Sequence, residues 1–215
     1  MKKELLEDEM NPIYWTGVTW FRSLARAIFD HQVVGQDKLI EEGGALICCN
    51  HESFLDPPMV GISFRNRIFY LARKTLFRSF GGWLYPRWNA IPIDQENPDP
   101  ASLKTIIKLL KGGNRVLMFP EGERSMDGKL LPGKAGVGLV AAKSKVPVQP
   151  VRIFGAYESL PRGSGKLKPQ PITIVVGDPI DFTEEEKSGR GKEGYQRIAD
   201  RIMAEIAKLE RPPGR

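Results

Sequence analysis

Residues 50–56 read Asn-His-Glu-Ser-Phe-Leu-Asp and follow directly on an apolar run at residues 45–49, Ala-Leu-Ile-Cys-Cys. Such a short apolar run predicts a buried β-strand, and the Pro-Pro-Met-Val sequence at residues 57–60 predicts the start of a helix. A strand that leads straight into a helix is typical of α/β domains, which present reactive groups at the carboxyl ends of their strands. We therefore expect residues 50–56 to lie at such an edge, with Ser53 or Asp56 capping the helix.

His51 is the better candidate for histidine chemistry of the two histidines in the chain, His31 and His51. Four residues separate it from Asp56, and a carboxylate beside an imidazole can fix its tautomer and stabilise the imidazolium ion. This pairing makes His51 a candidate general base. The alternative is that His51 is a polar loop residue and Asp56 a helix cap.

A second stretch has the same design. Residues 119–125 read Phe-Pro-Glu-Gly-Glu-Arg-Ser and follow the apolar run Val-Leu-Met at residues 116–118. The turn carries Glu121 and Arg124, and a guanidinium in such a turn suits a phosphate. Gly122 allows close backbone approach there. The alternative is a surface turn with one exposed ion pair.

Together these stretches resemble the glycerolipid acyltransferase family, the 1-acyl-glycerol-3-phosphate acyltransferases. The first family motif, N-H-x-x-x-x-D, is matched at Asn50, His51 and Asp56, and Ser53 also fits it. The third motif, F-P-E-G-x-R-S, is matched at residues 119–125 apart from its variable position. A basic segment at residues 72–77 precedes the expected second motif at residues 89–95, and residues 146–151 resemble the fourth. The four motifs occur in family order, and the resemblance covers roughly residues 20–180.

Three positions depart from the family pattern. The second motif usually ends in arginine, where this chain has Gln95. Glu123 stands where the third motif usually has threonine, and Gln149 stands where the fourth has an aliphatic residue. The missing arginine concerns the acceptor, because that position is expected to help hold its phosphate.

The resemblance implies an acyltransferase that moves a fatty acyl group from a thioester donor to the hydroxyl of a lysophosphatidate-like acceptor, giving phosphatidate in phospholipid biosynthesis. His51 would remove the hydroxyl proton, and Asp56 would orient His51. Direct attack is expected, since the chain has no G-x-S-x-G nucleophile elbow. The residues expected to bind substrate are Arg73, Lys74, Glu121, Gly122 and Arg124.

The implied donor is acyl-CoA or acyl carrier protein, with no separate cofactor. No metal is expected, because the two histidines are far apart and no metal-binding motif occurs. Three alternatives stay open. One is the same chemistry on another lysolipid, such as a lyso-ornithine lipid or a lysophospholipid with a larger head. The others are a non-catalytic membrane-binding protein on the same scaffold and a basic nucleic-acid binder.

Composition favours a membrane partner. The 215 residues carry a formal net charge of +6, which favours anionic partners, and no nucleic-acid motif is visible. The first ten residues lack the apolar region of a secretory signal, and no apolar run approaches the roughly 20 residues of a transmembrane helix. Cys48 and Cys49 are adjacent and cannot join distant segments, which suits a reducing compartment. We expect a peripheral or monotopic protein on the cytoplasmic face of an anionic membrane.

The whole pattern predicts one α/β domain with a central, mostly parallel or mixed sheet flanked by helices. Residues 1–30 are expected to form a membrane-contact segment with an amphipathic helix at residues 11–30, which packs on the domain's own core in the alternative interpretation. Residues 31–210 form the expected acyltransferase domain and residues 211–215 a disordered tail. Strands are expected at residues 45–49, 67–72, 90–93, 115–119, 148–153 and 172–176. Helices are expected near residues 101–111, 136–145 and 192–210.

Overall fold

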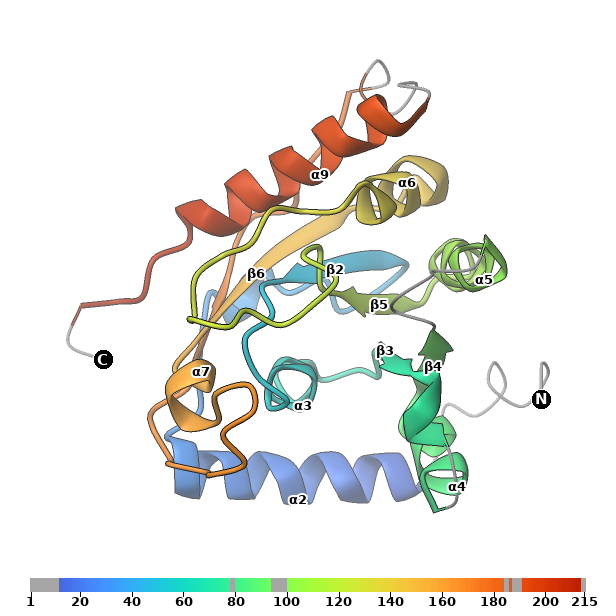
Figure 1. Ribbon diagram of the computed structural model, residues 1–215. Helices are drawn as coiled ribbons and strands as arrows, with labels where there is room; N and C mark the ends of the chain where they lie inside the picture. The colour runs from blue at the N-terminus through green and yellow to red at the C-terminus, as the bar shows by residue number, and fades with distance from the viewer. Residues whose placement is uncertain (1–11, 78–79, 94–99, 184–185, 187–190, 214–215) are drawn as a thin grey trace.

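A sheet lies between two layers of helices in the computed structural model (Figure 1), which describes residues 12–77, 80–93, 100–183, 186 and 191–213. The strands are β1 (Gln32–Val34), β2 (Ala45–Cys49), β3 (Phe69–Arg73), β4 (Ala90–Ile93), β5 (Arg115–Met118), β6 (Val148–Phe154) and β7 (Thr173–Val176). The helices are α2 (Pro12–Phe29), α3 (Asp56–Gly61), α4 (Phe80–Arg87), α5 (Pro100–Lys111), α6 (Ala135–Ser144), α7 (Ala156–Ser159) and α9 (Gly191–Lys208). Two short 3-10 helices are η1 (Gln36–Lys38) and η2 (Lys74–Phe77).

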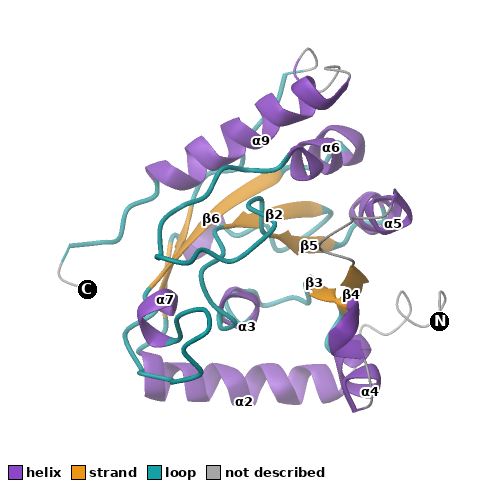
Figure 2. Cartoon of the chain, viewed as in Figure 1, coloured by secondary structure: helices purple, strands orange, loops and turns teal. Residues whose placement is uncertain are grey.

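The strand order in the sheet is β1-β7-β6-β2-β5-β3-β4. Strands β6, β2, β5, β3 and β4 run parallel to one another, whereas β7 is antiparallel to β6 and β1 is parallel to β7. The predicted α/β class with a mixed sheet is therefore confirmed. The helices in Figure 2 separate into the two layers, with α5, α6 and α9 over one face and α2, α3 and α7 over the other.

Strand β2 sits in the middle of the sheet and all five of its residues are buried. Its side chains alternate between the two faces. Leu46 and Cys48 belong to the core beneath α5, α6 and α9, whereas Ile47 and Cys49 belong to the core above α2 and α3. Coverage on both faces explains why this strand is a continuous apolar run without polar alternation.

Helix α2 packs on the core and also exposes apolar side chains. Tyr14, Ala25 and Phe29 are buried against the domain, so the core-packing interpretation of this segment is confirmed. A second apolar side of the same helix is exposed, and it carries Ile13, Trp20, Leu24 and Ile28. In the part of the chain that the structure describes, no helix combines the length and the apolar character needed to span a bilayer.

The unusual Gln149 of the fourth motif is completely buried, and its side-chain amide is fully engaged. Its Oε1 accepts from the Ile40 N–H at 2.8 Å, and its Nε2 donates to the carbonyls of Lys38 at 3.0 Å and Gly177 at 2.8 Å. Because each bond goes to backbone, the glutamine joins the segment after η1 to the end of β7. This departure from the family pattern therefore has a structural explanation.

Candidate active site

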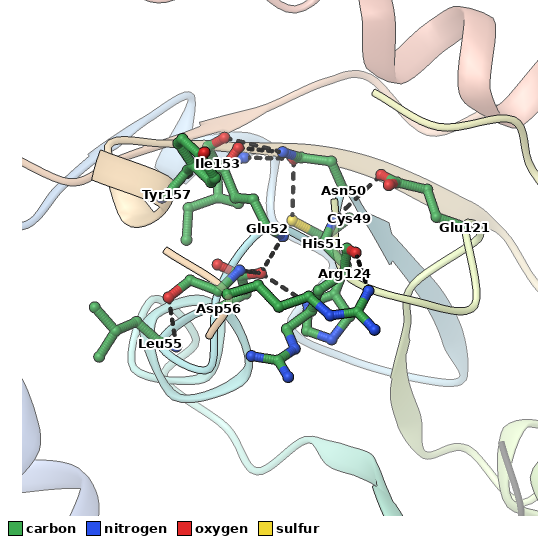
Figure 3. A network of polar contacts seen from close by, with 12 residues as sticks. Cys49, Asn50, His51, Glu52, Leu55, Asp56, Glu121, Arg124, Ile153 and Tyr157 are labelled. Atoms are coloured by element: carbon green, nitrogen blue, oxygen red, sulfur yellow. Dashed lines mark hydrogen bonds and ion pairs between the residues drawn. The ribbon is translucent and has the colours of Figure 1, made fainter. Parts of the chain in front are cut away.

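The candidate site lies at the carboxyl ends of the central parallel strands, where the sequence predicted it. Residues 50–56 follow β2, residues 119–125 follow β5, and Arg73 ends β3. Figure 3 shows the side chains of His51, Asp56, Glu121 and Arg124 gathered at this edge. The two motifs are joined directly, since the Ser125 N–H donates to the His51 carbonyl at 2.8 Å.

The His51 imidazole is held by Asp56. His51 Nδ1 lies 2.7 Å from Asp56 Oδ2, and the same carboxylate oxygen accepts the backbone N–H groups of Glu52 at 2.6 Å and Ser53 at 2.7 Å. Asp56 has no exposed surface, so this carboxylate is fixed by its surroundings. An Nδ1–H that donates to Asp56 leaves Nε2 as the basic nitrogen for a substrate proton.

The predicted helix cap was wrong in its details. Helix α3 begins at Asp56 itself, and its N-cap residue, Leu55, makes no side-chain capping bond. Asp56 instead turns back onto the loop that precedes the helix, because its Oδ2 accepts from that loop and from His51. The Ser53 hydroxyl donates to the Leu160 carbonyl at 2.9 Å, which ties the loop to the end of α7.

The ring of His51 is also fixed by stacking. It lies against Phe119 with ring centroids 3.9 Å apart and planes inclined by 15°. The other histidine has a different setting: His31 is buried, and its Nε2 lies 3.1 Å from the Met59 carbonyl. Burial lowers the pKa of His31 to about 4. His51 is thus the histidine that is placed beside other polar groups at an accessible edge.

The turn at residues 119–125 depends on Gly122. This residue has φ +72°, and a Cβ there would meet Lys134 Cδ at 2.9 Å. Its N–H donates to the Phe119 carbonyl at 3.0 Å and closes the turn. The closed turn places Glu121 beneath the first motif, where its Oε1 accepts the His51 N–H at 3.1 Å. The positive φ therefore favours glycine here, whereas movement of the flexible Lys134 side chain would relieve the contact with a Cβ.

Two buried carboxyls flank the His51–Asp56 pair. Burial, together with the smaller effect of the nearby Asp56, raises the pKa of Glu121 to about 7 and the pKa of Glu52 to about 8. Glu52 accepts the Tyr157 N–H at 3.2 Å, so it joins the catalytic loop to the start of α7. Both carboxyls can therefore carry a proton near neutral pH, which limits the negative charge packed around Asp56.

Arg124 extends from the same turn over an exposed aromatic ring. Its guanidinium carbon lies 3.6 Å from the ring centroid of Phe54, whose side chain is 64% exposed. Within the described residues, four buried side-chain polar atoms lack a hydrogen-bond partner, and three of them lie at this site: Asp56 Oδ1, Glu121 Oε2 and Arg124 Nη1. Buried polar atoms are usually satisfied, so such a cluster of unpaired atoms points to a polar ligand.

The structure brings most of the expected site residues together. His51, Asp56, Glu121 and Arg124 form one cluster in Figure 3, and Gly122 lies in the turn that carries Glu121 and Arg124. The charge of Arg73 is close enough to lower the pKa of Arg124, after the larger effects of burial and of Arg162. Lys74 follows Arg73 as the first residue of η2 and is exposed.

Some residues of the sequence-based prediction lie outside the described part of the chain, and two residues of the site were not predicted. Gln95 lies outside the described residues, as do residues 1–11 and 214–215 of the predicted terminal segments. Sequence reasoning missed Glu52, which occupies a variable position of the first motif. It also missed Arg162, whose Nη1 donates to the Arg124 carbonyl at 2.8 Å from a loop without any periodic signal.

Comparisons with known proteins identify relatives across most of the chain. The family model described as Acyltransferase matches residues 30–154. A 1-acyl-sn-glycerol-3-phosphate acyltransferase from Bacillus subtilis is 32% identical over 151 residues, which cover 69% of this chain and 73% of the relative. One from Streptococcus pneumoniae is 30% identical over 169 residues, covering 77% of this chain and 60% of the relative.

A solved structure has the same fold. The crystal structure of the 1-acyl-sn-glycerophosphate (LPA) acyltransferase PlsC from Thermotoga maritima is similar with a TM-score of 0.72 and 25% sequence identity, covering 92% of this chain and 80% of that one. The match of the family model spans more than half of the chain and contains the first and third motifs. The protein is therefore a member of the acyltransferase family that includes the 1-acyl-sn-glycerol-3-phosphate acyltransferases.

Proposed function

We propose that this protein transfers a fatty acyl group from a thioester donor to the free hydroxyl of lysophosphatidate, giving phosphatidate. The observation that carries the proposal is the 2.7 Å contact between His51 Nδ1 and Asp56 Oδ2 beside the unpaired Arg124 Nη1. The first pair supplies a base for a hydroxyl, and the arginine supplies a donor for a phosphate. The names of the relatives from Bacillus subtilis and Streptococcus pneumoniae support the same substrate.

His51 acts on the acceptor hydroxyl in the proposed reaction. Its Nε2 takes the hydroxyl proton as the oxygen attacks the thioester carbonyl, and a tetrahedral intermediate forms. Asp56 stabilises the resulting imidazolium ion. The intermediate then expels the thiolate, which receives the proton from His51, so the products are the ester and the free thiol. The reaction needs no cofactor beyond the donor, which is acyl-CoA or acyl carrier protein.

The acceptor phosphate is placed on the basic side of the site. Arg124 supplies the buried donor, and Arg73 adds a charge from the end of β3. Glu121 is placed to interact with an acceptor hydroxyl through its unpaired Oε2, because the other oxygen is already bonded to the His51 N–H. The proposed roles thus use two of the three unpaired atoms, Arg124 Nη1 and Glu121 Oε2.

We also propose that the protein works as a peripheral protein on the cytoplasmic face of an anionic membrane. A lysolipid acceptor resides in a membrane, and the exposed apolar side of α2 carries a tryptophan that is 75% exposed, Trp20. Tryptophan beside aliphatic side chains suits the boundary between headgroups and acyl chains. The net charge of +6 favours an anionic surface.

The test is an acyl-transfer assay with purified protein. Long-chain acyl-CoA and acyl carrier protein would each be offered as donor with a panel of lysolipids, and the products would be identified by mass. We expect phosphatidate from lysophosphatidate, formed at least about 100-fold more slowly by the His51→Ala variant. If the wild-type protein ignores lysophosphatidate and acylates a lysolipid with a zwitterionic head, the proposed acceptor is wrong and the acyltransferase chemistry stands. Failure with every donor and acceptor would favour a non-catalytic role.

A further inference from the structure

Three arginines from separate segments lie close together, and Arg124 interacts with the other two and with the charge of Asp56. Arg73 ends β3, Arg124 belongs to the turn after β5, and Arg162 lies in the loop that follows α7. Arg162 Nη1 donates to the Arg124 carbonyl at 2.8 Å. The charges of Arg162 and Arg73 both add to the effect of burial in lowering the pKa of Arg124, as expected for guanidinium groups held close together.

The backbone on both sides of Arg162 is anchored. Leu160 accepts the hydroxyl of Ser53 from the first motif at 2.9 Å, and the Ser164 N–H donates to the Pro161 carbonyl at 3.2 Å. The Arg162 side chain is one-third exposed, and Glu123 Oε2 lies 3.7 Å from its Nη1. Glu123 is itself half exposed and also pairs with Lys134 at 3.2 Å. The position of Arg162 is thus fixed by the same loop that holds His51.

The buried carboxylate of Asp56 offsets only part of this positive charge, because its effect on the pKa of Arg124 is smaller than that of Arg162 or of Arg73. Holding like charges together is unfavourable, and Arg124 Nη1 is buried without a partner in the part of the chain that the structure describes. Of the five donors of a guanidinium, Arg162 uses one nitrogen for the Arg124 carbonyl. A phosphate monoester placed between the two arginines would neutralise the charges and satisfy the buried donor.

We propose that Arg162 is a specificity-determining residue that binds the acceptor phosphate together with Arg124. The inference rests on the proposed function and adds to it a residue that none of the four sequence motifs contains. The second motif has Gln95 where the family has arginine, and Arg162 would supply a positive charge from the α7–β7 loop. Arg162 thereby favours acceptors with a phosphate monoester over acceptors with a zwitterionic head.

The experiment measures separate Michaelis constants for lysophosphatidate and for acyl-CoA in variants of the full chain. Arg162→Gln should raise the constant for lysophosphatidate about 10- to 100-fold, the loss expected for a charge-assisted hydrogen bond. The constant for acyl-CoA and the turnover at saturation should change less than about threefold. Lys166→Gln is the matched control, since it removes one positive charge from an exposed position of the same loop and should leave both constants unchanged.

Arg162→Lys decides the question if Arg162→Gln fails to fold. The lysine keeps the charge and lacks the planar guanidinium, so the Michaelis constant for lysophosphatidate should lie between those of wild type and Arg162→Gln. If the Arg162→Gln protein does not fold, the constant of Arg162→Lys should still lie a few-fold above that of wild type. A purely structural role would alter turnover, or both constants together, and either result would overturn the inference. An increase confined to acyl-CoA would also overturn it, because Arg162 would then bind the donor. If the wild-type protein itself shows no activity on lysophosphatidate, the result would instead contradict the proposed function.

Discussion

His51 receives its orientation from two sides, from Asp56 at one ring nitrogen and from Phe119 at the ring face. We expect His51→Ala to lower the turnover number about 10²- to 10⁴-fold, the contribution of a positioned general base, with the fold retained. Asp56→Asn should be strongly impaired as well, because an amide can hold the imidazole in the wrong tautomer. Steady-state kinetics together with circular dichroism would check both. Wild-type turnover by a folded His51→Ala protein would contradict the mechanism.

Glu52 makes stability depend on pH. Its pKa is about 8 in the folded protein against an ordinary value of 4.5, so the folded state binds more protons between these values. Its contribution is therefore fully present below pH 4.5 and is lost as the pH rises through 8. Glu52→Gln keeps an acceptor for the Tyr157 N–H and removes the titration.

We therefore expect the free energy of unfolding of wild type to fall between pH 5 and pH 8.5 by up to a few kcal/mol more than that of Glu52→Gln, since one unit of pKa difference corresponds to about 1.4 kcal/mol. Urea unfolding at the two pH values would measure this difference. Glu121 titrates in both proteins, so its effect on the free energy of unfolding cancels when the two are compared. Parallel profiles for the two proteins would show that Glu52 is not the source.

The sequence predicted the site residues that lie within two short contiguous segments. His51 and Asp56, and likewise Glu121 and Arg124, belong to short stretches after apolar runs, so strand ends alone place them at one edge. Arg162 carries no such signal, because its loop is irregular and its contact with Arg124 spans 38 positions of the chain. Its position depends on how the loop folds back, which no local pattern encodes.

At the scale of elements, α2 has a buried side and an exposed apolar side along the same 18 residues. Arg22 does not accompany the exposed side. Its guanidinium donates to the carbonyls of Ile62 at 3.0 Å and Phe64 at 2.9 Å, so it holds α2 against the segment after α3. Arg26, one turn further along α2, is exposed, so the helix offers one positive charge beside its apolar contacts, and the charge of the whole protein adds to the attraction to an anionic surface.

We expect the protein to sediment with anionic vesicles more than with neutral ones and to be released in part by high salt. The double variant Trp20→Ser/Leu24→Ser should bind at least about tenfold more weakly, because each side chain loses roughly 1.5–3 kcal/mol of apolar burial. Thr19→Ala/Ser23→Ala is the matched control, since both hydroxyls are exposed and bond within the helix. Equal failure of the wild type with both vesicle types would contradict the proposed membrane contact.

The shortest elements were absent from the sequence-based expectations. β1 has three residues and pairs only with β7 among the strands that the structure describes, and α7 has four residues. The four-residue strands β4 and β5 were predicted because they contain apolar runs, whereas β1 and α7 show no distinct pattern in so few residues, so their structure follows from tertiary contacts. The longer elements, such as β2 and α9, were predicted within a few residues of their ends because periodicity and apolar runs extend over their full length.

At the scale of the whole molecule, the alternation of strands and helices predicted the layers and left the direction of β7 open. β7 runs antiparallel to β6, because the chain returns through the loop after α7 and not through a crossover helix. That return is also what brings residues 160–164 to the catalytic edge. The antiparallel strand and the position of Arg162 are therefore two results of one connection.

The adjacent thiols of β2 give each helix layer its own chemical reporter. Cys48 and Cys49 are both fully buried, and burial raises the pKa of each well above its ordinary value. A thiol reagent can react only after the layer above that side chain has opened. In Cys49→Ala the remaining thiol is Cys48, and its labelling rate measures the opening of the α5–α6–α9 layer. In Cys48→Ala the remaining thiol is Cys49, and its labelling rate measures the opening of the α2–α3 layer. Equal rates would mean that the two halves open as one cooperative unit, whereas faster labelling of Cys49 would mean that the layer carrying the exposed apolar residues of α2 detaches first.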